Sequence, residues 1–470
     1  MNIIKENIFL IFICILISLS SNTLVIAGKD NDGNCNIDPN NIENIFLLGH
    51  NNPAKELLAF LLDSDLNFNN INFIKSLSEI IDEINLSKNK NNLKDEIKLR
   101  IVNLASSKIS KIWPDGKLPQ SVCLPTDDLK MIDDDPWMRD FCKIAIVKIK
   151  GENKEKTLII DTNRDKGISI LAKKLSKYWD NSFVVNIQNP GYGGDHGGNI
   201  EVTANNILYT GENSSSELIK FWKEKGYQDN IVIMKTNWLQ VAHVDEQITT
   251  IIKPNDPCGM AIVKADPKLA IDTLLSLGEE SYKDFPSKFK SERMYKILTE
   301  FHNYLNTNRL QIKNNSSGTL TIPLSSSNNI INTNDKSYQM LGKQLSVAKI
   351  IDDNVNALKE KIIKKTPECK NIKIVSIPML YDCPKGFDIN LPANCRSLLP
   401  GSVNMTVLGQ DLIIPDPLYS PFKKIIKTSF EKEQQIPHFI EDVIYHKFHG
   451  DVHCATNEFR CSDNFSGHTQ

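Results

Sequence analysis

Patterns typical of short β-strands alternate with patterns typical of amphipathic helices along most of the chain, from about Ile45 onward. The clearest helical pattern runs from Val347 to Ile362, where apolar residues recur at the spacing of one helix face. The predicted strands are 144–147, 157–160, 183–187, 199–203, 207–210, 230–235, 372–377, 403–408 and 412–414, and further predicted helices are 167–178 and 215–225. Alternation of this kind predicts an α/β fold.

Two polar segments stand apart from this alternation. Residues 306–336 are rich in Asn, Ser and Thr, which predicts a long mobile surface insertion. Residues 28–44 predict a polar, poorly ordered lead-in to the fold. Because nothing marks a second independent core, we expect residues 45–470 to form one domain that contains the insertion.

The first 27 residues differ in character from the rest. Lys5 provides a short charged start, an almost unbroken apolar run follows from Ile8 to Leu19, and Val25 to Ala27 fits a cleavage site before Gly28. This layout predicts a secretory signal peptide. An uncleaved membrane anchor is the alternative, but the run is short for a full span. We therefore expect a secreted protein, or one of the secretory-pathway lumen, cleaved near Ala27 and without stable membrane association.

Cysteine usage agrees with export. Of the 10 cysteines, Cys14 lies in the leader, so an odd number remains and at least one thiol has no internal partner. Cys383 and Cys395 are close in sequence, with Pro384, Gly386 and Pro392 between them, and form a reasonable disulfide pair. The other pairings stay open. No CxxC motif or paired Cys/His spacing indicates zinc.

Glycosylation sequons occur at several positions, and whether they carry glycans is left open. The exposed-looking ones are Asn85, Asn213, Asn314, Asn315 and Asn464. Asn404 also matches, but it lies in an apolar, strand-like run and is expected to be poorly accessible. The net charge of −2, from 55 basic and 57 acidic residues, predicts no general attraction to nucleic acid or anionic lipid.

Four segments gather ionisable residues and glycines. They are Asp133 to Asp140, which contains Trp137; the turn Gly191 to Glu201; Trp238 to Glu246, which contains His243 and Asp245; and Phe448 to Asn457, which contains Cys454. Taken singly, each has a plainer explanation, such as a structural His–Asp pair, half of a disulfide or a solvated acidic face. The glycine-rich turn lacks a following helix and a phosphate-loop lysine, so nucleotide binding is not indicated.

Together the four segments suit one substrate group, a guanidinium. Two carboxylates can bind this planar cation on opposite edges, a role available to Asp140 and Asp245. Its central carbon is a poor electrophile, so attack requires a thiolate, which Cys454 can provide. A histidine must protonate the departing nitrogen and then activate water, a role available to His243.

The same segments resemble, in the same order, the motifs of the protein-arginine deiminase (peptidylarginine deiminase) family of the amidinotransferase-like superfamily. The motifs are Trp-x-x-Asp at 137–140, Gly-Asn-x-Glu-Val at 198–202, His-Val-Asp-Glu at 243–246 and Gly-x-Val-His-Cys-x-Thr-Asn at 450–457. The resemblance covers residues 130 to 460 and extends, with the strand–helix alternation, to the whole of 45–470. It implies a five-bladed α/β propeller, the pentein fold, with pseudo-fivefold repeats.

The resemblance also implies an activity and the residues that perform it. The family hydrolyses peptidyl-arginine to citrulline and ammonia through a covalent thiouronium on cysteine, so the expected substrates are arginine-containing proteins or peptides. Cys454 corresponds to the nucleophile, His243 to the general acid and base, and Asp140 and Asp245 to the guanidinium ligands. The resemblance also implies that two further residues bind the substrate. Trp137 would pack along the aliphatic part of the arginine side chain, and Arg164 would hydrogen-bond to the substrate backbone.

Calcium is where the chain departs most from its family. The resemblance implies a Ca²⁺ ion held by residues on either side of the first catalytic aspartate, but those positions are Arg139 and Lys143 here, while Glu201 of the glycine turn is kept. A hard dication needs oxygen ligands, and two cations would repel it. We therefore expect no cofactor, with Arg139 and Lys143 pairing with Glu201 in place of the ion. A second family arginine is replaced by Lys166, and another by Phe448.

Three other functions are compatible with parts of the sequence. A deiminase of free arginine or agmatine would keep the same core residues, but Trp137 and Arg164 favour a peptide substrate. A non-catalytic secreted propeller would not need all four catalytic residue types. A cysteine protease would not need two carboxylates converging on a substrate cation.

Overall fold

The computed structural model describes residues 25–27, 42–63, 69–90, 96–123, 135–149, 151, 155–162, 164, 171–179, 182–186, 193–277, 285–290, 292–308, 336–384 and 392–461. The predicted signal peptide up to residue 24, the lead-in from 28 to 41 and the insertion from 309 to 335 lie outside these residues. Within them, no helix is both long and apolar enough to cross a bilayer.

Five sheets of the described chain share one arrangement of strands. In each, the first strand is antiparallel to the second, the second is parallel to the third, and one or more helices join the second to the third. A helical crossover is the usual way to connect neighbouring parallel strands, because a tight turn cannot bring the chain back to its starting end. The chain is therefore built from a repeated β-β-α-β unit.

The five units follow one another along the chain in the order of their second strands. The first contains β19 (Thr456–Arg460), β3 (Ala54–Phe60), α2 (Ile71–Lys90) and β4 (Lys98–Val102). The second contains β5 (Cys142–Ile149), β6 (Lys156–Asp161), α4 (Leu171–Ser176) and β7 (Ser182–Asn186), and the third contains β8 (Ile200–Val202), β9 (Leu208–Gly211), α5 (Ser216–Trp222) and β10 (Ile231–Met234).

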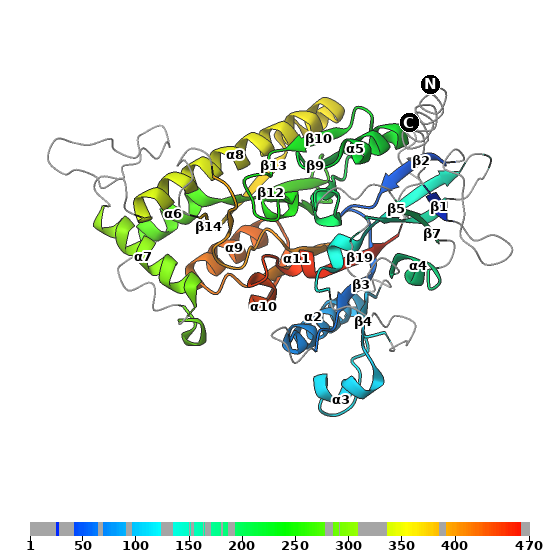
Figure 1. The fold of residues 1–470 in the computed structure, drawn as a ribbon, viewed down its shortest axis with the longest axis horizontal. Helices are drawn as coiled ribbons and strands as arrows, with labels where there is room; N and C mark the ends of the chain where they lie inside the picture. The colour runs from blue at the N-terminus through cyan, green and yellow to red at the C-terminus, as the bar shows by residue number, and fades with distance from the viewer. Residues whose placement is uncertain are drawn as a thin grey trace, which may run out of the picture.

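The fourth unit is the largest. It contains β11 (Ile248–Ile252), β12 (Met260–Asp266), three crossover helices α6 (Pro267–Ser276), α7 (Arg293–Thr307) and α8 (Lys336–Lys365), and β13 (Lys373–Pro378). The fifth contains β16 (Thr406–Leu408), β17 (Asp411–Pro415), α9 (Ser420–Lys432) and β18 (Ile436–Ile440). In Figure 1 the long helices α6, α7 and α8 lie together at one end of the molecule, away from β5 and β7.

Shorter elements complete the fold. β2 (Ile42–Leu47) and β1 (Val25–Ala27) extend the second sheet at its two edges, and β14 (Tyr381–Asp382) pairs with β15 (Arg396–Ser397). The remaining helices and helical turns are η2 (Ser106–Lys108), α3 (Ile109–Ile112), η4 (Met138–Phe141), η5 (Gly197–Asn199), η6 (Lys223–Tyr227), η7 (Val244–Glu246), η9 (Ser287–Phe289), η10 (Pro367–Asn371), α10 (Val443–His446) and α11 (Val452–Ala455).

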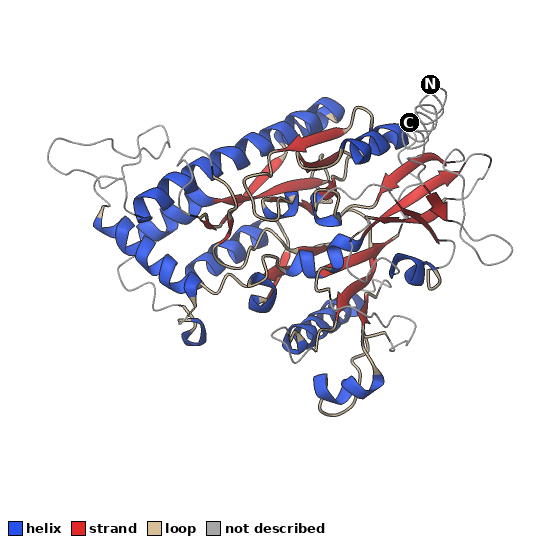
Figure 2. Cartoon of the chain, in the orientation of Figure 1, coloured by secondary structure: helices blue, strands red, loops and turns tan. Residues whose placement is uncertain are grey.

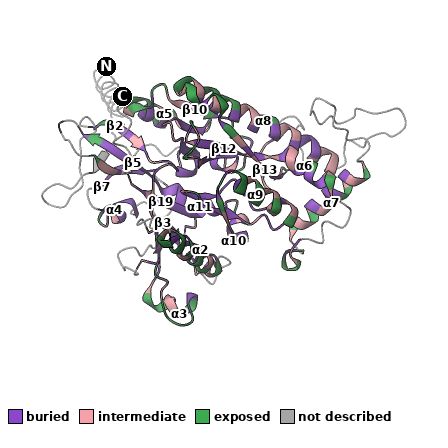
Figure 3. Cartoon of the chain, turned by 180° about the vertical axis from the view of Figure 1, so that it is seen from behind, coloured by how far each residue is buried: buried purple, intermediate pink, exposed green. Residues whose placement is uncertain are grey.

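Apolar residues of the helices pack against the strands, and this packing forms the core. The helices lie mainly outside the strands (Figure 2), and the exposed parts of α2, α8 and α9 lie on their outer sides (Figure 3). The predicted helical face of α8 is buried throughout: Val347, Ile351, Val355, Leu358 and Ile362 are at most 2% exposed. Burying such a side chain stabilises the fold by about 1.5–3 kcal/mol. The predicted mixed α/β fold is confirmed.

Several predicted boundaries are wrong. β2 begins at Ile42, inside the predicted lead-in, and Lys336 at the end of the predicted insertion already belongs to α8. The strand predicted over 403–408 is shorter, because β16 starts only at Thr406 and the preceding Ser402 to Asn404 form a turn. Hydrogen bonds of the Asn404 side chain hold that turn, and apolar periodicity does not reveal them.

Two disulfides join described residues. Cys383 bonds to Cys395, as predicted, and clips the short β14–β15 pair at its base. Cys258 bonds to Cys369 over a sequence separation of 111, linking the turn before β12 to η10. Cys454 belongs to neither, in agreement with the expectation of a thiol outside the disulfides.

Candidate active site

Each of the five first strands follows a turn that carries a polar residue. These residues are Asp140 before β5, Asn199 before β8, Asp245 before β11, Asn404 before β16 and Cys454 before β19. All five residues are at most 5% exposed. The repeated unit thus supplies one buried polar group per sheet from an equivalent position. The sequence motifs contain four of these five turns. The turns are unevenly spaced along the chain, yet each occupies the same position in its repeated unit.

Gly198 locates the centre of the site. A Cβ atom on Gly198 would lie 2.7 Å from His243 Nδ1, 3.1 Å from Asp245 Oδ2 and 3.2 Å from Asp140 Oδ1. Three of the predicted catalytic groups therefore surround a single point, and only glycine leaves it open. The fourth joins them, because Cys454 Sγ lies 3.7 Å from Asp245 Oδ2. The structure brings together all four residues for which catalytic roles were predicted.

Cys454 lies in α11 and is 5% exposed. Burial, followed by the Asp245 and Asp140 carboxylates, raises the pKa of its thiol well above the ordinary value. Attack on a guanidinium carbon requires a thiolate close to groups that favour negative charge. Carboxylates favour the opposite, so in this structure the thiol is protonated and requires a positive charge nearby to ionise.

His243 has distinct partners at its two ring nitrogens. Nε2 lies 3.0 Å from the carbonyl oxygen of Gly193, which can only accept, so Nε2 carries the proton. Nδ1 is then the basic nitrogen, and among the described residues it has no hydrogen-bond partner, although Asp140 Oδ1 is 3.8 Å away. The backbone N–H of His243 donates to Glu246 Oε1 at 3.0 Å. This arrangement directs the basic Nδ1 toward the centre of the site.

Asp140 is bound by the chain's own guanidinium. Arg164 Nη1 donates to Asp140 Oδ2 at 2.9 Å, while Arg164 Nε donates to Asp135 Oδ2 at 2.6 Å. The N–H of Gly198 donates to the other oxygen, Oδ1, at 3.2 Å. Burial alone would raise the pKa of Asp140, but His243 and Arg164 outweigh it and lower that pKa below its usual value. Asp140 is therefore ionised, and Arg164 has carboxylate partners rather than an open position. The predicted contact of Arg164 with a substrate backbone stays a prediction.

His453 and Asn404 belong to the site, although the sequence assigned neither a role there. His453 Nδ1 lies within hydrogen-bond distance of Asp245 Oδ2, at 2.8 Å. Asn404 Nδ2 donates to Cys454 Sγ at 3.3 Å, and Asn404 Oδ1 accepts from the N–H of Cys454 at 3.1 Å. Asn404 belongs to a glycosylation sequon and was predicted to be poorly accessible. It is 3% exposed, which confirms that prediction. Asn404 is the single polar residue between the apolar Val403 and Met405, and this pattern is the sequence feature that indicates a buried role for it.

Trp137 lies at the edge of the site next to Gly450. A Cβ atom on Gly450 would come within 2.3 Å of the Trp137 ring, so the two residues are in close contact. The centroid of the Trp137 ring also lies 6.0 Å from the centroid of the Tyr445 ring. Trp137 is partly exposed, which leaves part of its face for a ligand. Phe448, where the family keeps an arginine, is 46% exposed on the neighbouring turn.

Calcium does not fit the residues at its expected position. Lys143 Nζ donates to Glu201 Oε1 at 2.7 Å, as predicted. Arg139 pairs with Glu458, at 2.6 Å from Nη2 to Oε1, so its predicted pairing with Glu201 is wrong. The reason is geometric: Glu458 follows Cys454 on β19, beside the turn that holds Arg139. A dication would have to displace one ammonium or guanidinium and remain next to the other, which electrostatic repulsion disfavours.

Two groups of described residues have the spacing of metal ligands. In the first, His50, Glu201 and His453, the carboxylate is already bound by Lys143, and burial, Arg139 and Lys143 lower the pKa of His453 well below its usual value. The second is Asp140, His196 and His243, where Arg164 Nη1 contacts both Asp140 and His196. Cations of the chain therefore occupy both groups.

Comparison with known structures shows the class of fold. The agmatine deiminase of C. jejuni superposes with a TM-score of 0.51 at 13% sequence identity, and the match covers 89% of this chain and 96% of that one. At this identity the likeness concerns the fold alone: a mixed α/β architecture of the kind found in guanidino-group deiminases.

Sequence comparison identifies the family. The family model for protein-arginine deiminase (PAD) matches residues 196–466, more than half of the chain, and the protein belongs to this family. Human protein-arginine deiminase type-1 is 27% identical over 234 residues, which are 48% of this chain and 28% of the human protein. The match thus spans less than a third of that relative's length. The family model, over residues 196–466, contains the recognised motifs from Gly198 onward.

Proposed function

We propose that the protein hydrolyses the guanidinium of arginine within peptides or proteins, releasing ammonia and leaving citrulline. The observation that carries this proposal is the convergence of Asp140, His243 and Asp245 on the point left open by Gly198, with Cys454 alongside. Two carboxylates facing one point suit a guanidinium better than any neutral group. Membership of the deiminase family supports the reaction type, and the repeated units support a five-bladed propeller closed around this site.

The bound substrate would provide the positive charge that Cys454 lacks. A guanidinium between Asp140 and Asp245 offsets their charges, so it favours loss of the thiol proton to His243 Nδ1. The thiolate then attacks the central guanidinium carbon, and His243 passes the proton to the departing nitrogen, which leaves as ammonia. A thiouronium on Cys454 remains. His243 next takes a proton from water, the resulting hydroxide displaces the thiolate, and citrulline is released.

Cys454→Ala tests the nucleophile. The variant is expected to fold normally, because the side chain shrinks only slightly, and to form no citrulline from an arginine peptide. Thermal unfolding provides the control for folding. Citrulline formation at the native rate by a folded Cys454→Ala protein would refute the mechanism, and faster turnover of free arginine or agmatine than of the blocked peptide would favour the sibling activity.

We further propose that activity needs no metal ion, because the cations of Arg139 and Lys143 stand in its place. Citrulline formation should be the same in excess chelator and in added Ca²⁺. Lys143→Met should lower both stability and activity, since it leaves the buried Glu201 carboxylate without its ammonium partner. Lys148→Met on the same strand is the matched control, because the Lys148 side chain is 51% exposed. Activity that stops with chelator and returns with Ca²⁺ would contradict the proposal.

The predicted signal peptide and secreted location stay proposals of the same kind. They rest on residues 1–27 and on the two disulfides, since disulfides persist in oxidising compartments. Recovery of the protein from culture medium, with an N-terminus near Gly28, would support them. The expected absence of nucleic-acid and membrane partners rests only on the near-neutral charge.

A further inference from the structure

A narrow cavity connects Cys454 to a residue for which neither the motifs nor the reaction supplies a role. Its lining includes Cys454, Asn404, Gly401, His449 and Arg396. Arg396 comes from β15, far in sequence from all four catalytic residues. Its side chain is 30% exposed, so it can meet a molecule that enters from solvent. A guanidinium at the entrance of a pocket for a guanidinium requires an explanation, because it would repel that end of the substrate.

The contacts of Arg396 leave it with unused capacity. Arg396 Nη1 lies 3.1 Å from His449 Nδ1, and Nη2 lies 3.6 Å from Asp382 Oδ2. Asp382 is held more closely by another guanidinium, with Arg293 Nη2 at 2.7 Å from the same oxygen. Two guanidiniums therefore face one carboxylate, which leaves a net positive charge. These contacts also use only part of the five N–H donors of Arg396.

The carboxylates that line the same cavity do not supply the missing partner. Asp451 Oδ2 accepts from the N–H of Gly401 at 2.9 Å, and its other oxygen lies 3.3 Å from His446 Nδ1. Glu246 Oε1 accepts from the N–H of His243 at 3.0 Å. One oxygen of each carboxylate thus accepts from a backbone N–H of the site, and neither carboxylate forms an ion pair with Arg396 in the described residues. The group that Arg396 can bind has to come with the ligand, and a guanidinium binds a carboxylate best because the two planar groups match.

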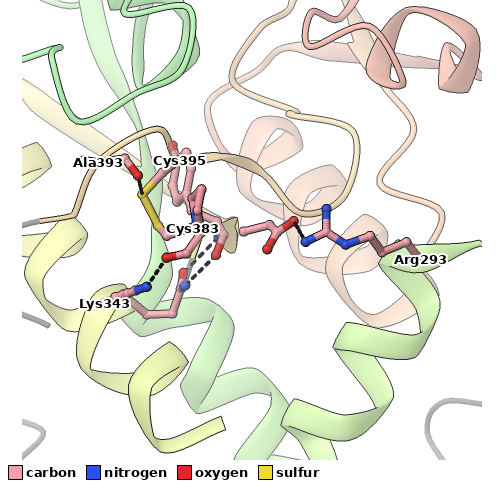
Figure 4. Close-up of a disulfide and its surroundings, with 9 residues drawn as sticks. Arg293, Lys343, Cys383, Ala393 and Cys395 are labelled. Atoms are coloured by element: carbon pink, nitrogen blue, oxygen red, sulfur yellow. Dashed lines mark hydrogen bonds and ion pairs between the residues drawn. A yellow bond between two sulfur atoms is a disulfide. The ribbon is translucent and has the colours of Figure 1, made fainter. Parts of the chain in front are cut away.

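The disulfide Cys383–Cys395 fixes this arrangement. Cys383 follows Asp382 and Cys395 precedes Arg396, so the bond joins the two positions next to the charged pair. Figure 4 shows the disulfide beside the ion pair of Arg293, with Lys343 on its other side. Lys343 Nζ donates to the carbonyl of Pro384 and adds a further tie to α8. His449, the other partner of Arg396, has a φ of 74°, a backbone conformation that is uncommon outside glycine and is often kept at functional positions.

We propose that Arg396 binds a carboxylate of the substrate close to the reacting arginine, and that the Cys383–Cys395 disulfide holds Arg396 in place for this role. The proposal rests on the proposed function, since it concerns the same pocket. Two sources have this chemistry: the α-carboxylate of a carboxyl-terminal arginine, and the side chain of an acidic neighbour. In both cases Arg396 is a specificity-determining residue rather than one that takes part in the bond changes.

Four peptides of equal length test the proposal and separate the two sources. One ends in arginine with a free carboxylate, one ends in arginine amide, and two carry an internal arginine next to either aspartate or alanine. The native protein should have a lower KM for at least one carboxylate peptide than for its neutral counterpart. Arg396→Gln should raise that KM about 10- to 100-fold, the effect of one charge-assisted hydrogen-bonded contact, with little change in kcat and none for the neutral peptides.

Matched variants distinguish the effect of where the guanidinium lies from the effect of its positive charge. Arg293→Gln removes a guanidinium from the same carboxylate but outside the cavity of Cys454, so it should raise the KM of the carboxylate peptides less than Arg396→Gln does, by leaving Asp382 to Arg396 alone. Arg396→Lys should give an intermediate KM, because an ammonium lacks the planar fork. Paired Cys383→Ser and Cys395→Ser changes should raise KM as Arg396→Gln does. Paired Cys258→Ser and Cys369→Ser changes remove the other disulfide and should lower stability without that effect.

The outcomes distinguish this inference from the proposed function. If no peptide yields Cys454-dependent citrulline, both fail. If all four peptides are converted with similar KM, or if Arg396→Gln slows all of them equally, the proposed function stands and the carboxylate contact is overturned. Should the double serine variants fail to fold, Arg396→Gln and Arg396→Lys, which break no disulfide, still decide the question.

Discussion

Gly198 shows how one missing side chain can define a catalytic centre. Its position is equidistant, to within a few tenths of an ångström, from a histidine nitrogen and two carboxylate oxygens. The Gly-Asn-x-Glu-Val motif contains this residue, yet a glycine in sequence has many explanations. Here the cause is spatial, because a Cβ atom at this position would press on His243 and on the carboxylates of Asp245 and Asp140. The neighbouring Asn199 shapes the same centre: its Oδ1 accepts from the N–H of Val244 at 3.1 Å and so holds the turn of His243 and Asp245.

Gly198→Ala should therefore inactivate the protein without unfolding it. The new methyl group lies closer than 3.0 Å to His243 Nδ1, so the histidine has to move, and kcat/KM is expected to fall about 100-fold or more. Gly116→Ala is the control. Its Cβ meets nothing within 4 Å, and its positive φ adds strain of about 1–2 kcal/mol without reaching the site. Citrulline formation and thermal unfolding, measured for both, check the prediction. Native kcat/KM in Gly198→Ala would show that the guanidinium binds elsewhere.

The elements that hold the site are short turns tied together by buried ion pairs. Glu458 on β19 is placed between two guanidiniums, with Arg139 Nη2 at 2.6 Å and Arg460 Nη2 at 3.7 Å. Burial alone would raise the pKa of Glu458, but Arg139 and Arg460 outweigh it and lower the pKa to about 2. Arg139 belongs to the turn of Asp140, and β19 continues the chain from Cys454. This ion pair therefore fixes the turn of Cys454 against the turn of Asp140.

Glu458→Gln should destabilise the fold by about 3–5 kcal/mol at neutral pH, because two buried guanidiniums lose their carboxylate. The folded-state pKa of Glu458 is lowered, so its stabilisation is fully present above about pH 4.5 and is lost as the pH falls toward 2. The difference between native and variant should shrink over that range. Urea unfolding at several pH values measures it. Glu431→Gln, in an exposed pair with Lys427, is the matched control and should change stability by less than about 0.5 kcal/mol. A pH-independent difference would contradict the assignment.

At the scale of the whole molecule, the last strand of the described chain pairs with one of its early strands. β19 pairs antiparallel with β3, so that Asn457 lies opposite Leu58 and Thr456 opposite Ala59. The first repeated unit is thus completed only by the last strand. The turn that carries Cys454 comes just before that strand, so the position of Cys454 depends on the pairing of β19 with β3.

A chain that ends at Ala455 should therefore lose more than one strand. Without β19, the edge of β3 is left unpaired, and exposed strand edges promote aggregation. We expect a lower unfolding enthalpy by calorimetry and no citrulline formation, although Cys454 is still present. A chain that ends at Cys461 keeps β19 whole and is the matched control. Full activity in the shorter chain would mean that β19 does not position Cys454.

Much of the protein could be predicted from local patterns, and the limits of that prediction are physical. The apolar spacing of α8, the alternation of strands and helices and the Cys383–Cys395 pair depend on neighbours in sequence, so they were predicted from it. Asp140, His243, Asp245 and Cys454 were found because their motifs resemble a family. The partner of Arg139 was predicted wrongly, since Glu458 is distant in sequence and the choice between two glutamates depends on which turn lies closer.

The sequence by itself determined which residue types are available for the chemistry and in what order the repeated units follow. Only the tertiary structure decided that Asp140, His243 and Asp245 meet around Gly198, that His243 Nε2 carries the ring proton, that His453 and Asn404 contact Asp245 and Cys454, and that Arg396 lines the same cavity as Cys454. The reason is that hydrogen bonds and charge pairs act over a few ångströms in space. Residues separated by hundreds of positions come within that distance only when the sheets have packed.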